Sequence, residues 1–446
     1  MRGGKATGRK SIRIGCGAGY SGDRIDPAVE LAAKGSLSYL VFECLAERTI
    51  ALAQKARLVD PQSGYDTLLE ERMEAVLPIC AEQKIRIITN MGAANPLGAA
   101  AKTKAIAQRL GLRGLRIAAV TGDDVLALAL GAGSGASEVS RENILSANAY
   151  LGVEPILEAL AADADVILTG RVADPSLFLA PLIHEFGWPL EDWRLLGQGT
   201  VIGHLLECAG QVTGGYFADP GYKDVAGLAR LGFPLAEVAE DGSAVIMKVE
   251  GSGGRITVAT CKEQLLYEIQ DPAAYFTPDV VADFSRVTLR ELSEDHIHVS
   301  GGSGGPRPET LKVSVGYRDG FMGEGQISYA GPGALARAKL AQAILAERLQ
   351  DYGLSELRFD LIGLNSTHGE GLSHMDCEPY EIRLRAAGKA EILKAAAMIW
   401  REVEALYTNG PAGGGGVTGV TREIVAIASM LMPRAEIAHR IHYEVS

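Results

Sequence analysis

The chain lacks several features that would place it in a familiar class of protein. It has six cysteines among 446 residues, and they are widely scattered with no CxxC pair, which argues against a disulfide-stapled secreted scaffold and for reduced thiols. It also lacks a basic block, and its formal net charge of -12 opposes binding to a nucleic-acid backbone or an anionic membrane.

Long apolar runs are missing as well. The longest, IVAIASMLM at residues 424–432, is too short to span a bilayer. The basic start, MRGGKATGRKSIRIG, is not followed by an apolar stretch of signal-peptide length. We therefore expect a cytoplasmic protein with no nucleic-acid and no membrane partner.

The first half of the chain alternates between strand-like and helix-like segments. Apolar strand patterns alternate with helical patterns, and the 54 glycines suit tight turns between them. The expected strands are 11–16, 37–44, 85–90, 115–122 and 164–170. The expected helices are 28–35, 46–57, 66–82, 96–111, a stretch near 140–162, and one that starts at Asp174.

This alternation predicts parallel strands joined by crossover helices. Residues 1–224 are expected to form an α/β domain with a doubly wound parallel sheet, a barrel-like variant being the alternative. Residues 225–446 read differently, with paired strands such as SAVIMKVEG (243–251) and GRITVAT (254–260) and helices at 333–350 and 388–407. They are expected to form an α+β domain with antiparallel strands.

Polar residues follow the predicted parallel strands at the edge where ligands gather in such sheets. We expect them to line one crevice for a small anionic metabolite, with Arg171 and Arg24 holding carboxylates and Asn90 orienting the substrate. Asp174 has a second interpretation as a helix N-cap, and Arg171 as an ion-pair partner. The residues of this crevice are Cys16, Asp23, Arg24, Glu43, Asn90, Thr121, Asp123, Arg171 and Asp174.

A glycine motif follows the first strand and supports an alternative function. Gly17, Gly19 and Gly22 have the spacing of a dinucleotide-binding loop, and Glu43 lies 21 residues later, which is the pattern of an NAD(P)-dependent oxidoreductase. The predicted helix begins only at Pro27, however. The glycines are then either turn residues or backbone donors for another anion.

The block GHLLECAGQVTGGYFADP, residues 203–220, is dense in reactive groups. His204 and Glu207 are predicted on one helix face, with Cys208 on the same side. Together with Glu43, His204 and Glu207 are our candidates for proton transfer beside a carbonyl group. Cys208 is either a nucleophile or a small buried hydrophobic residue. Asp219, in a predicted loop, is a candidate for binding substrate or a divalent ion.

No cofactor is assigned by the sequence, although a divalent metal is a candidate. His296 and His298 lie on one face of a predicted strand, as metal-sharing imidazoles would. A second stretch is rich in possible metal ligands, but their order is not the His-Glu-x-x-His of zincins. The alternative interpretation of this stretch is a solvated surface loop. It contains His368, Glu370, His374, Asp376, Cys377 and Glu378.

Six long blocks together resemble the acyclic terpene utilisation AtuA family, in order, from about residue 11 to about 430. The resemblance implies an enzyme of carboxylic acid catabolism. Some members carry an additional C-terminal region, and others resemble a large subunit with a separate small partner. This chain resembles the second form, which implies a small partner subunit. The blocks are GAGYSGDRIDPAVELAAKG, YLVFECLAERTIALAQ, ITNMGAANP, TGRVADPSL, GHLLECAGQVTGGYFADPG and KVSVGYRDGF.

Three hypotheses follow. The first is a lyase, such as a hydratase, or an isomerase acting on a short branched or polycarboxylic acid or its CoA ester, in an oligomeric enzyme. The second is an NAD(P)-dependent oxidoreductase. The third is a non-catalytic assembly subunit for the small partner.

Overall fold

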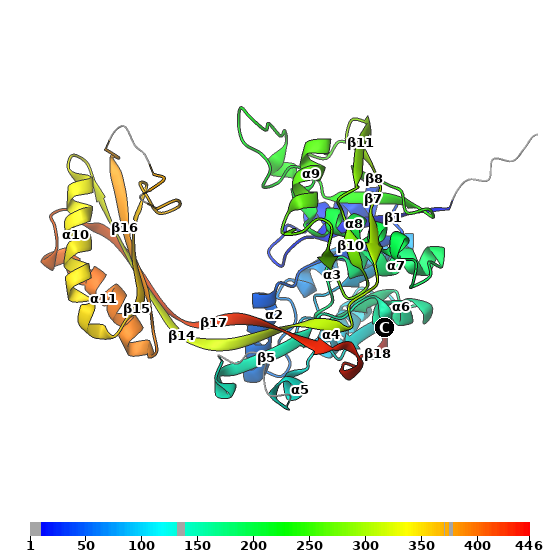
Figure 1. Cartoon of the computed structure of the whole chain (residues 1–446), viewed down its shortest axis with the longest axis horizontal. Helices are drawn as coiled ribbons and strands as arrows, with labels where there is room; N and C mark the ends of the chain where they lie inside the picture. Colours follow the sequence, from blue (N-terminus) through cyan, green and yellow to red (C-terminus); the bar gives the residue numbers. More distant parts are fainter. Residues whose placement is uncertain (1–9, 132–138, 370, 374–377) are drawn as a thin grey trace, which may run out of the picture. The chain divides into compact units, whose positions relative to one another are not determined.

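The computed structural model describes residues 10–131, 139–369, 371–373 and 378–446, which form two compact units (Figure 1). Unit 1 comprises Met1–Gly316 and Ile427–Ser446, and unit 2 comprises Tyr317–Ala426. This division differs from the expected one at residue 224, because strands that follow residue 225 are hydrogen-bonded into the same sheet as the first strand of the chain.

Unit 1 is built on a mixed sheet in the order β11-β12-β8-β7-β1-β2-β3-β6-β4-β18. The five strands from β1 to β4 in this order are parallel, as the alternation of strands and helices predicts, and those outside them are antiparallel. The parallel strands are β1 (Ser11–Ala18), β2 (Tyr39–Phe42), β3 (Arg86–Thr89), β6 (Val166–Leu168) and β4 (Arg116–Thr121). The antiparallel strands are β7 (Pro234–Ala239), β8 (Ala244–Lys248), β11 (Thr288–Ser293), β12 (His296–Ser300) and β18 (Arg440–Val445).

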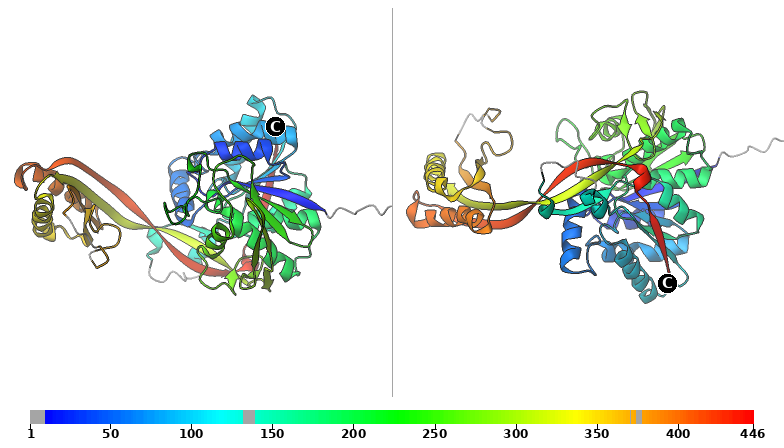
Figure 2. Two further views of the ribbon diagram at one scale, coloured as in Figure 1. Left: turned by 90° about the horizontal axis from the view of Figure 1, so that it is seen from above. Right: turned by 60° about the horizontal axis from the view of Figure 1, so that its bottom comes forward.

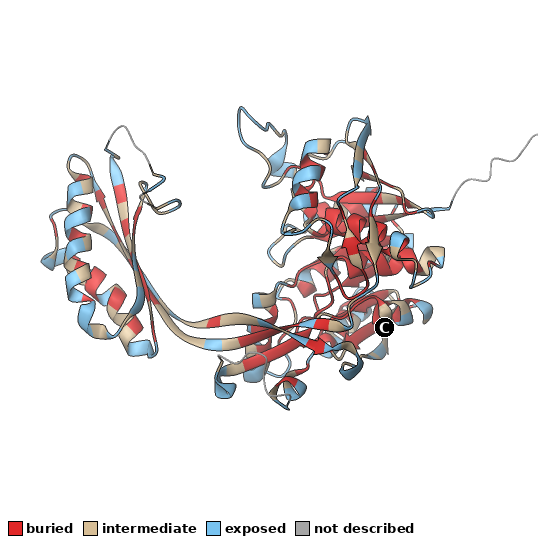
Figure 3. Ribbon diagram, viewed as in Figure 1, coloured by how far each residue is buried: buried red, intermediate tan, exposed pale blue. Residues whose placement is uncertain are grey.

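Helix α8 (Trp193–Glu207) lies inside unit 1. Every residue from Leu195 to Glu207 is buried, as the red ribbon of Figure 3 shows. It packs against α7, α9, β1, β7 and a small sheet of β9, β10 and β13. A helix covered on all sides is apolar all round, so His204 and Glu207 in its last turn are exceptions that require an explanation.

The remaining elements of unit 1 connect or cover these strands. The helices are α1 (Asp26–Lys34), α2 (Glu47–Val59), α3 (Leu69–Gln83), α4 (Pro96–Arg109), α5 (Leu126–Gly131), α6 (Glu154–Ala161), α7 (Ser176–Phe186) and α9 (Val258–Leu266). The further strands are β5 (Ile144–Ala149), β9 (Tyr275–Phe276), β10 (Val281–Asp283) and β13 (Ser303–Gly305). None of the helices in the described ranges has the length and apolar character that crossing a bilayer requires.

Two predicted elements are wrong. The expected helix near 140–162 is interrupted by strand β5, which pairs with β14. The expected strand GRITVAT is instead the start of α9: Thr257 caps this helix by accepting a hydrogen bond from the amide of Thr260, and the Thr260 hydroxyl accepts one from the amide of Thr257. This reciprocal capping overrides the strand preference of the β-branched residues.

Unit 2 contains a β-α-β-β-α-β sequence of elements with the sheet order β15-β16-β14-β17. This is the ferredoxin-like split βαβ arrangement. Helices α10 and α11 both pack on β16 and on each other (Figure 2), and they enclose a separate apolar core that includes Tyr329, Leu384 and Val403. The elements are β14 (Thr310–Ala330), α10 (Ala334–Arg348), β15 (Ser355–Ile362), β16 (Glu381–Ala390), α11 (Leu393–Asn409) and β17 (Gly415–Pro433).

Candidate functional site

Two cavities in unit 1 lie beyond the carboxyl ends of the parallel strands. Cavity A, of about 810 Å³, is lined by the loop 19–24 after β1, by residues 43–46 after β2 and by Glu207 and Cys208 at the end of α8. Cavity B, of about 910 Å³, is lined by segments that include 45–48 and 171–175. Leu45, Ala46, Asp174 and Glu268 line both, so the cavities share a junction.

Glu43 is a carboxyl group of cavity A with a raised pKa. It is buried, and its Oε1 accepts hydrogen bonds from Asn90 Nδ2 (2.8 Å) and from the amide of Leu45 (2.9 Å). Burial raises the pKa of Glu43 to about 8, the charge of Asp174 acts in the same direction, and Arg171 opposes both. Glu43 therefore holds a proton at neutral pH.

Asn90 does not line either cavity but holds Glu43 in place. It is fully buried, and while its Nδ2 donates to Glu43, its Oδ1 accepts from the amide of Cys44 at 2.7 Å. Both ends of the amide are thus used within the protein. The structure places Asn90 behind the linings of both cavities, where it positions Glu43.

Arg171 and Asp174 form an ion pair at the junction of the cavities. Arg171 is buried, donates to the carbonyl oxygens of Leu45 and Val172 as well as to Asp174, and stacks on the ring of Tyr150 with 4.5 Å between its Cζ and the ring centroid. Asp174 makes no side-chain cap for α7. The ion-pair interpretation of Arg171 fits this geometry better than a free anion-binding guanidinium.

His204 and Glu207 interact within the last turn of α8, on the face that the sequence predicted. His204 Nδ1 and Glu207 Oε1 form a hydrogen bond with 2.7 Å between them, and the imidazole contacts the rings of Tyr275 and Phe284, which also contact each other. Burial raises the pKa of Glu207, whereas His204 opposes that shift. Among the described residues, neither His204 Nε2 nor Glu207 Oε2 has a hydrogen-bond partner.

Cys208 lines cavity A beside Glu207. Burial raises the pKa of its thiol, and the neighbouring Glu207 charge raises it further. A thiol in such surroundings stays protonated and is a poor nucleophile. Cys208 is therefore better interpreted as a small, half-buried residue of the cavity wall than as a nucleophile.

The glycine loop after β1 does not fit a dinucleotide. The amide of Gly19 donates to Asp23 Oδ2 at 2.7 Å, helix α1 begins only at Asp26, and Glu43 is buried against Asn90. Instead, each glycine lies where the Cβ of any other residue would be too close to a neighbouring group of the protein. A Cβ on Gly17 would meet the Phe42 ring, one on Gly19 the backbone of Cys208, and one on Gly22 the Tyr20 ring.

Arg24 and Asp219 occupy more external positions than expected. Arg24 lines cavity A but is exposed, and it donates to the carbonyl oxygens of Leu228 and Ala229. Asp219 is exposed in a turn closed by its backbone pairing with Lys223, and it lines neither cavity. Gly17 also lies outside both linings.

Sequence reasoning missed Arg72, a fully buried cation of α3. It forms an ion pair with Asp66 (3.2 Å) and donates to the carbonyl oxygens of Tyr20, Ser21 and Asp23. Arg72 thus holds the loop that forms one wall of cavity A. The only signal was an arginine directly before Met73 on a helix face that is otherwise apolar.

Cavity B contains the cations that remain accessible near the site. Lys312 has a half-exposed side chain, pairs with Glu47 (2.7 Å) and lies over the Tyr150 ring. Arg48 is exposed on the same lining, and no ion pair involves it within the described residues. An anionic group of a ligand would therefore find its cations in cavity B.

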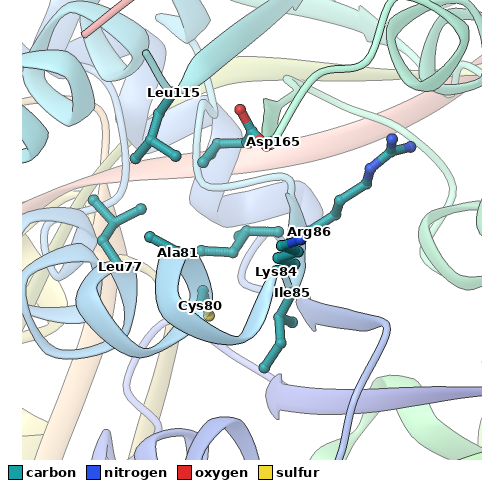
Figure 4. Close-up of a pocket in the computed structure, with 10 residues that line it drawn as sticks. Leu77, Cys80, Ala81, Lys84, Ile85, Arg86, Leu115 and Asp165 are labelled. Carbon is teal, nitrogen blue, oxygen red and sulfur yellow. The ribbon is translucent and has the colours of Figure 1, made fainter. Parts of the chain in front are cut away.

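A third cavity, of about 430 Å³, lies at the opposite, amino ends of the strands (Figure 4). Most of its labelled side chains are apolar. Arg86 extends away from the others and pairs with Asp163 at 3.1 Å, and Asp165 accepts from the amide of Arg116. Ligands of parallel sheets gather at the carboxyl ends, so this cavity is not our candidate.

The structure does not support the two metal-binding candidates of the sequence, which are the pair His296 and His298 and the stretch 368–378. In the described part of the chain, no group of three or more His, Cys, Asp or Glu side chains is arranged to hold a metal ion. His296 Nδ1 lies 2.7 Å from the carbonyl oxygen of Glu294. Of the second stretch, Glu370, His374, Asp376 and Cys377 lie outside the described residues.

Comparison with known proteins gives one result. A family model described as acyclic terpene utilisation family protein AtuA matches residues 12–443, nearly the whole chain. No curated protein and no solved structure matches the chain.

Proposed function

This chain belongs to the acyclic terpene utilisation AtuA family, and on that premise we propose that it is a lyase or isomerase of carboxylic acid catabolism. The reaction is the movement of a proton in cavity A, most simply the addition or removal of water. The family description supports a catabolic role, and the side chains of the cavity support the chemistry.

The observation that carries the proposal is the state of Glu43. A carboxyl group with a pKa of about 8 is protonated at neutral pH, and it lines a cavity where a ligand can reach it. Such groups serve as general acids in enzymes. Two hydrogen bonds, from Asn90 and Leu45, fix its orientation.

Glu207 supplies the complementary base. The raised pKa of Glu207 makes this carboxylate a stronger proton acceptor once it is ionised. His204 Nδ1 is hydrogen-bonded to Oε1 of the same carboxylate and fixes its orientation. In a dehydration, Glu207 removes a proton from the carbon next to the carbonyl group. The electron pair of that C–H bond forms the C=C bond, and the hydroxyl group leaves as water with the proton of Glu43.

The carboxylate of the substrate is then bound in cavity B, by Lys312 and Arg48. This differs from the expected ligands Arg171 and Arg24, because the side chains of both donate to protein carbonyl oxygens. Asp174, at the junction of the two cavities, lies between the binding end and the reacting end of such a substrate.

The test is exchange of substrate C–H hydrogens with D₂O, followed by proton NMR over a panel of hydroxy acids, unsaturated acids and their thioesters. We expect Glu43→Gln and Glu207→Gln each to slow exchange or turnover by about 10²–10⁴-fold. Glu30→Gln, which alters a surface pair on α1, is the matched control. Unchanged rates in both site variants would refute the assignment.

A further inference from the structure

The proposed reaction requires a hydrogen-bond donor that neither Glu43 nor Glu207 supplies. When Glu207 removes a proton from the carbon next to the carbonyl group, negative charge develops on the carbonyl oxygen. A donor that is already in place lowers the free energy of that state, because it needs no reorganisation when the charge appears. Such a donor must lie near Glu207, be accessible to a ligand and be free of partners within the protein.

Tyr275 of β9 meets these conditions. It is partly exposed in the lining of cavity B. Its hydroxyl oxygen is accessible to solvent, and it has no hydrogen-bond partner among the described residues. Two other hydroxyl groups of the same lining are engaged: that of Tyr150 bonds to Glu47 at 3.1 Å, and that of Thr277 donates to the carbonyl oxygen of Val280 at 2.8 Å.

The ring of Tyr275 is held beside the proposed base. Its centroid lies 5.6 Å from that of His204, whose Nδ1 is hydrogen-bonded to Glu207, and 5.4 Å from that of Phe284. The backbone of Tyr275 pairs with Ala282 of β10, and β10 packs on α8. Contacts of the ring and pairing of the backbone limit the movement of the hydroxyl group, as a preorganised donor requires.

The phenol of Tyr275 also keeps its proton in these surroundings. Burial raises the pKa of the phenol, and the charges of Glu207, Asp174 and Glu268 act in the same direction. Glu207 lines cavity A, while Asp174 and Glu268 line both cavities, so the charged neighbours of the phenol lie at the junction and at the reacting end. A protonated phenol can donate a hydrogen bond, whereas a phenolate cannot.

We propose that Tyr275 is a further catalytic residue, whose hydroxyl group donates a hydrogen bond to the carbonyl oxygen of the substrate as Glu207 removes the neighbouring proton. The electron pair of the C–H bond forms a double bond to the carbonyl carbon, and the π pair of the carbonyl group moves onto oxygen. Tyr275 keeps its proton throughout. When the C=O bond re-forms, the C=C bond forms beside it and the hydroxyl group leaves as water with the proton of Glu43.

This role rests on the proposed function of the same site and adds a group that stabilises the intermediate. The experiment is Tyr275→Phe in the full chain, which removes the hydroxyl group and keeps the ring. With the panel member that the wild type exchanges fastest, we expect exchange of C–H hydrogens with D₂O to slow by about 10²–10³-fold. In turnover assays, kcat should fall while KM stays within about twofold, because the donor acts on charge that develops only in the transition state.

Two measurements separate this role from a structural one. The urea midpoint of Tyr275→Phe should not fall, since the hydroxyl group has no partner within the described part of the protein. Tyr222→Phe, which removes an exposed hydroxyl group outside both linings, is the matched control and should exchange at the wild-type rate. Slower exchange accompanied by a lower urea midpoint in Tyr275→Phe would overturn the catalytic role.

The outcomes also distinguish this inference from the proposed function. Exchange in Tyr275→Phe within about threefold of wild type, alongside a loss in Glu207→Gln, would reject the tyrosine donor and keep the two proton-transfer groups. A loss in Tyr275→Phe with unchanged rates in Glu43→Gln and Glu207→Gln would do the reverse. Wild-type protein that exchanges no member of the panel would overturn both.

Discussion

Glu43 shows how a single residue links the stability of this protein to its chemistry. Its position beyond a predicted buried strand was readable from the sequence, because the alternation of strands and helices places strand ends together. Its raised pKa was not, because that depends on burial and on Asp174, which is far away along the chain. For the same reason the sequence did not reveal Arg72, Glu268 or Lys312.

The pKa of Glu43 predicts a pH dependence of stability. Since the folded value of about 8 lies above the ordinary value of 4.5, the folded state binds the extra proton between these pH values. Stability should therefore fall as pH rises from about 4.5 to 8, by up to about 1.4 kcal/mol per pH unit. Urea unfolding across this range should show a flatter dependence for Glu43→Gln. Identical slopes would contradict the shifted pKa.

Asn90 gives a second prediction at this scale. Asn90→Ala removes a hydrogen bond that lowers the pKa of Glu43, so the high-pH limb of the activity profile should move upward. It also leaves the buried amide of Cys44 without its acceptor, which should lower the free energy of unfolding by about 1–3 kcal/mol. Rate–pH profiles and urea titrations measure the two effects. A destabilised variant with an unmoved profile would leave Asn90 with a purely structural role.

At the scale of elements, the close approach of β1 to the end of α8 holds the two walls of cavity A together. A Cβ on Gly19 would lie 2.4 Å from the backbone carbon of Cys208. Within the glycine motif that suggested a cofactor loop, Gly19 is explained by this contact. Sequence alone does not distinguish a glycine that admits a ligand from one that admits another part of the chain.

Two alanine substitutions test whether a glycine of this motif is required for packing against the rest of the chain. Gly19→Ala should destabilise unit 1 by about 1–3 kcal/mol, because backbone atoms cannot move aside cheaply. Gly22→Ala meets only the exposed side chain of Tyr20 and should change stability by less than about 1 kcal/mol. Urea unfolding in a Trp400→Phe background reports on unit 1 through Trp188 and Trp193. Equal effects of the two substitutions would refute this account.

At the scale of the whole molecule, unit 1 is formed by two segments that are separated along the sequence. The residues of unit 2 lie between these two segments in the sequence. The alternation of the first half predicted the parallel strands correctly. It did not predict that β7, β8, β11, β12 and β18 extend the same sheet, because β1 pairs with β7 and β4 with β18 across long separations, which leave no local pattern. The boundary expected at residue 224 therefore marks a change of strand direction, not the edge of a compact unit.

Unit 2 should fold by itself. Its helices α10 and α11 enclose an apolar core of their own, and Glu402 is held by two hydrogen bonds from Arg348 and one from Tyr352. We expect residues 317–426, expressed alone, to show mixed α/β circular dichroism and a cooperative thermal transition. A fragment without dispersed NMR signals would contradict this independence.

The interruption of unit 1 has a consequence for synthesis. Ile427 and Leu431, which line cavity B, and β18, which pairs with β4, leave the ribosome only after all of unit 2. The nascent chain must therefore hold an unfinished sheet edge and an open pocket while more than a hundred residues are translated. Chaperone dependence during that interval, more than final stability, should limit the yield of this protein in cells.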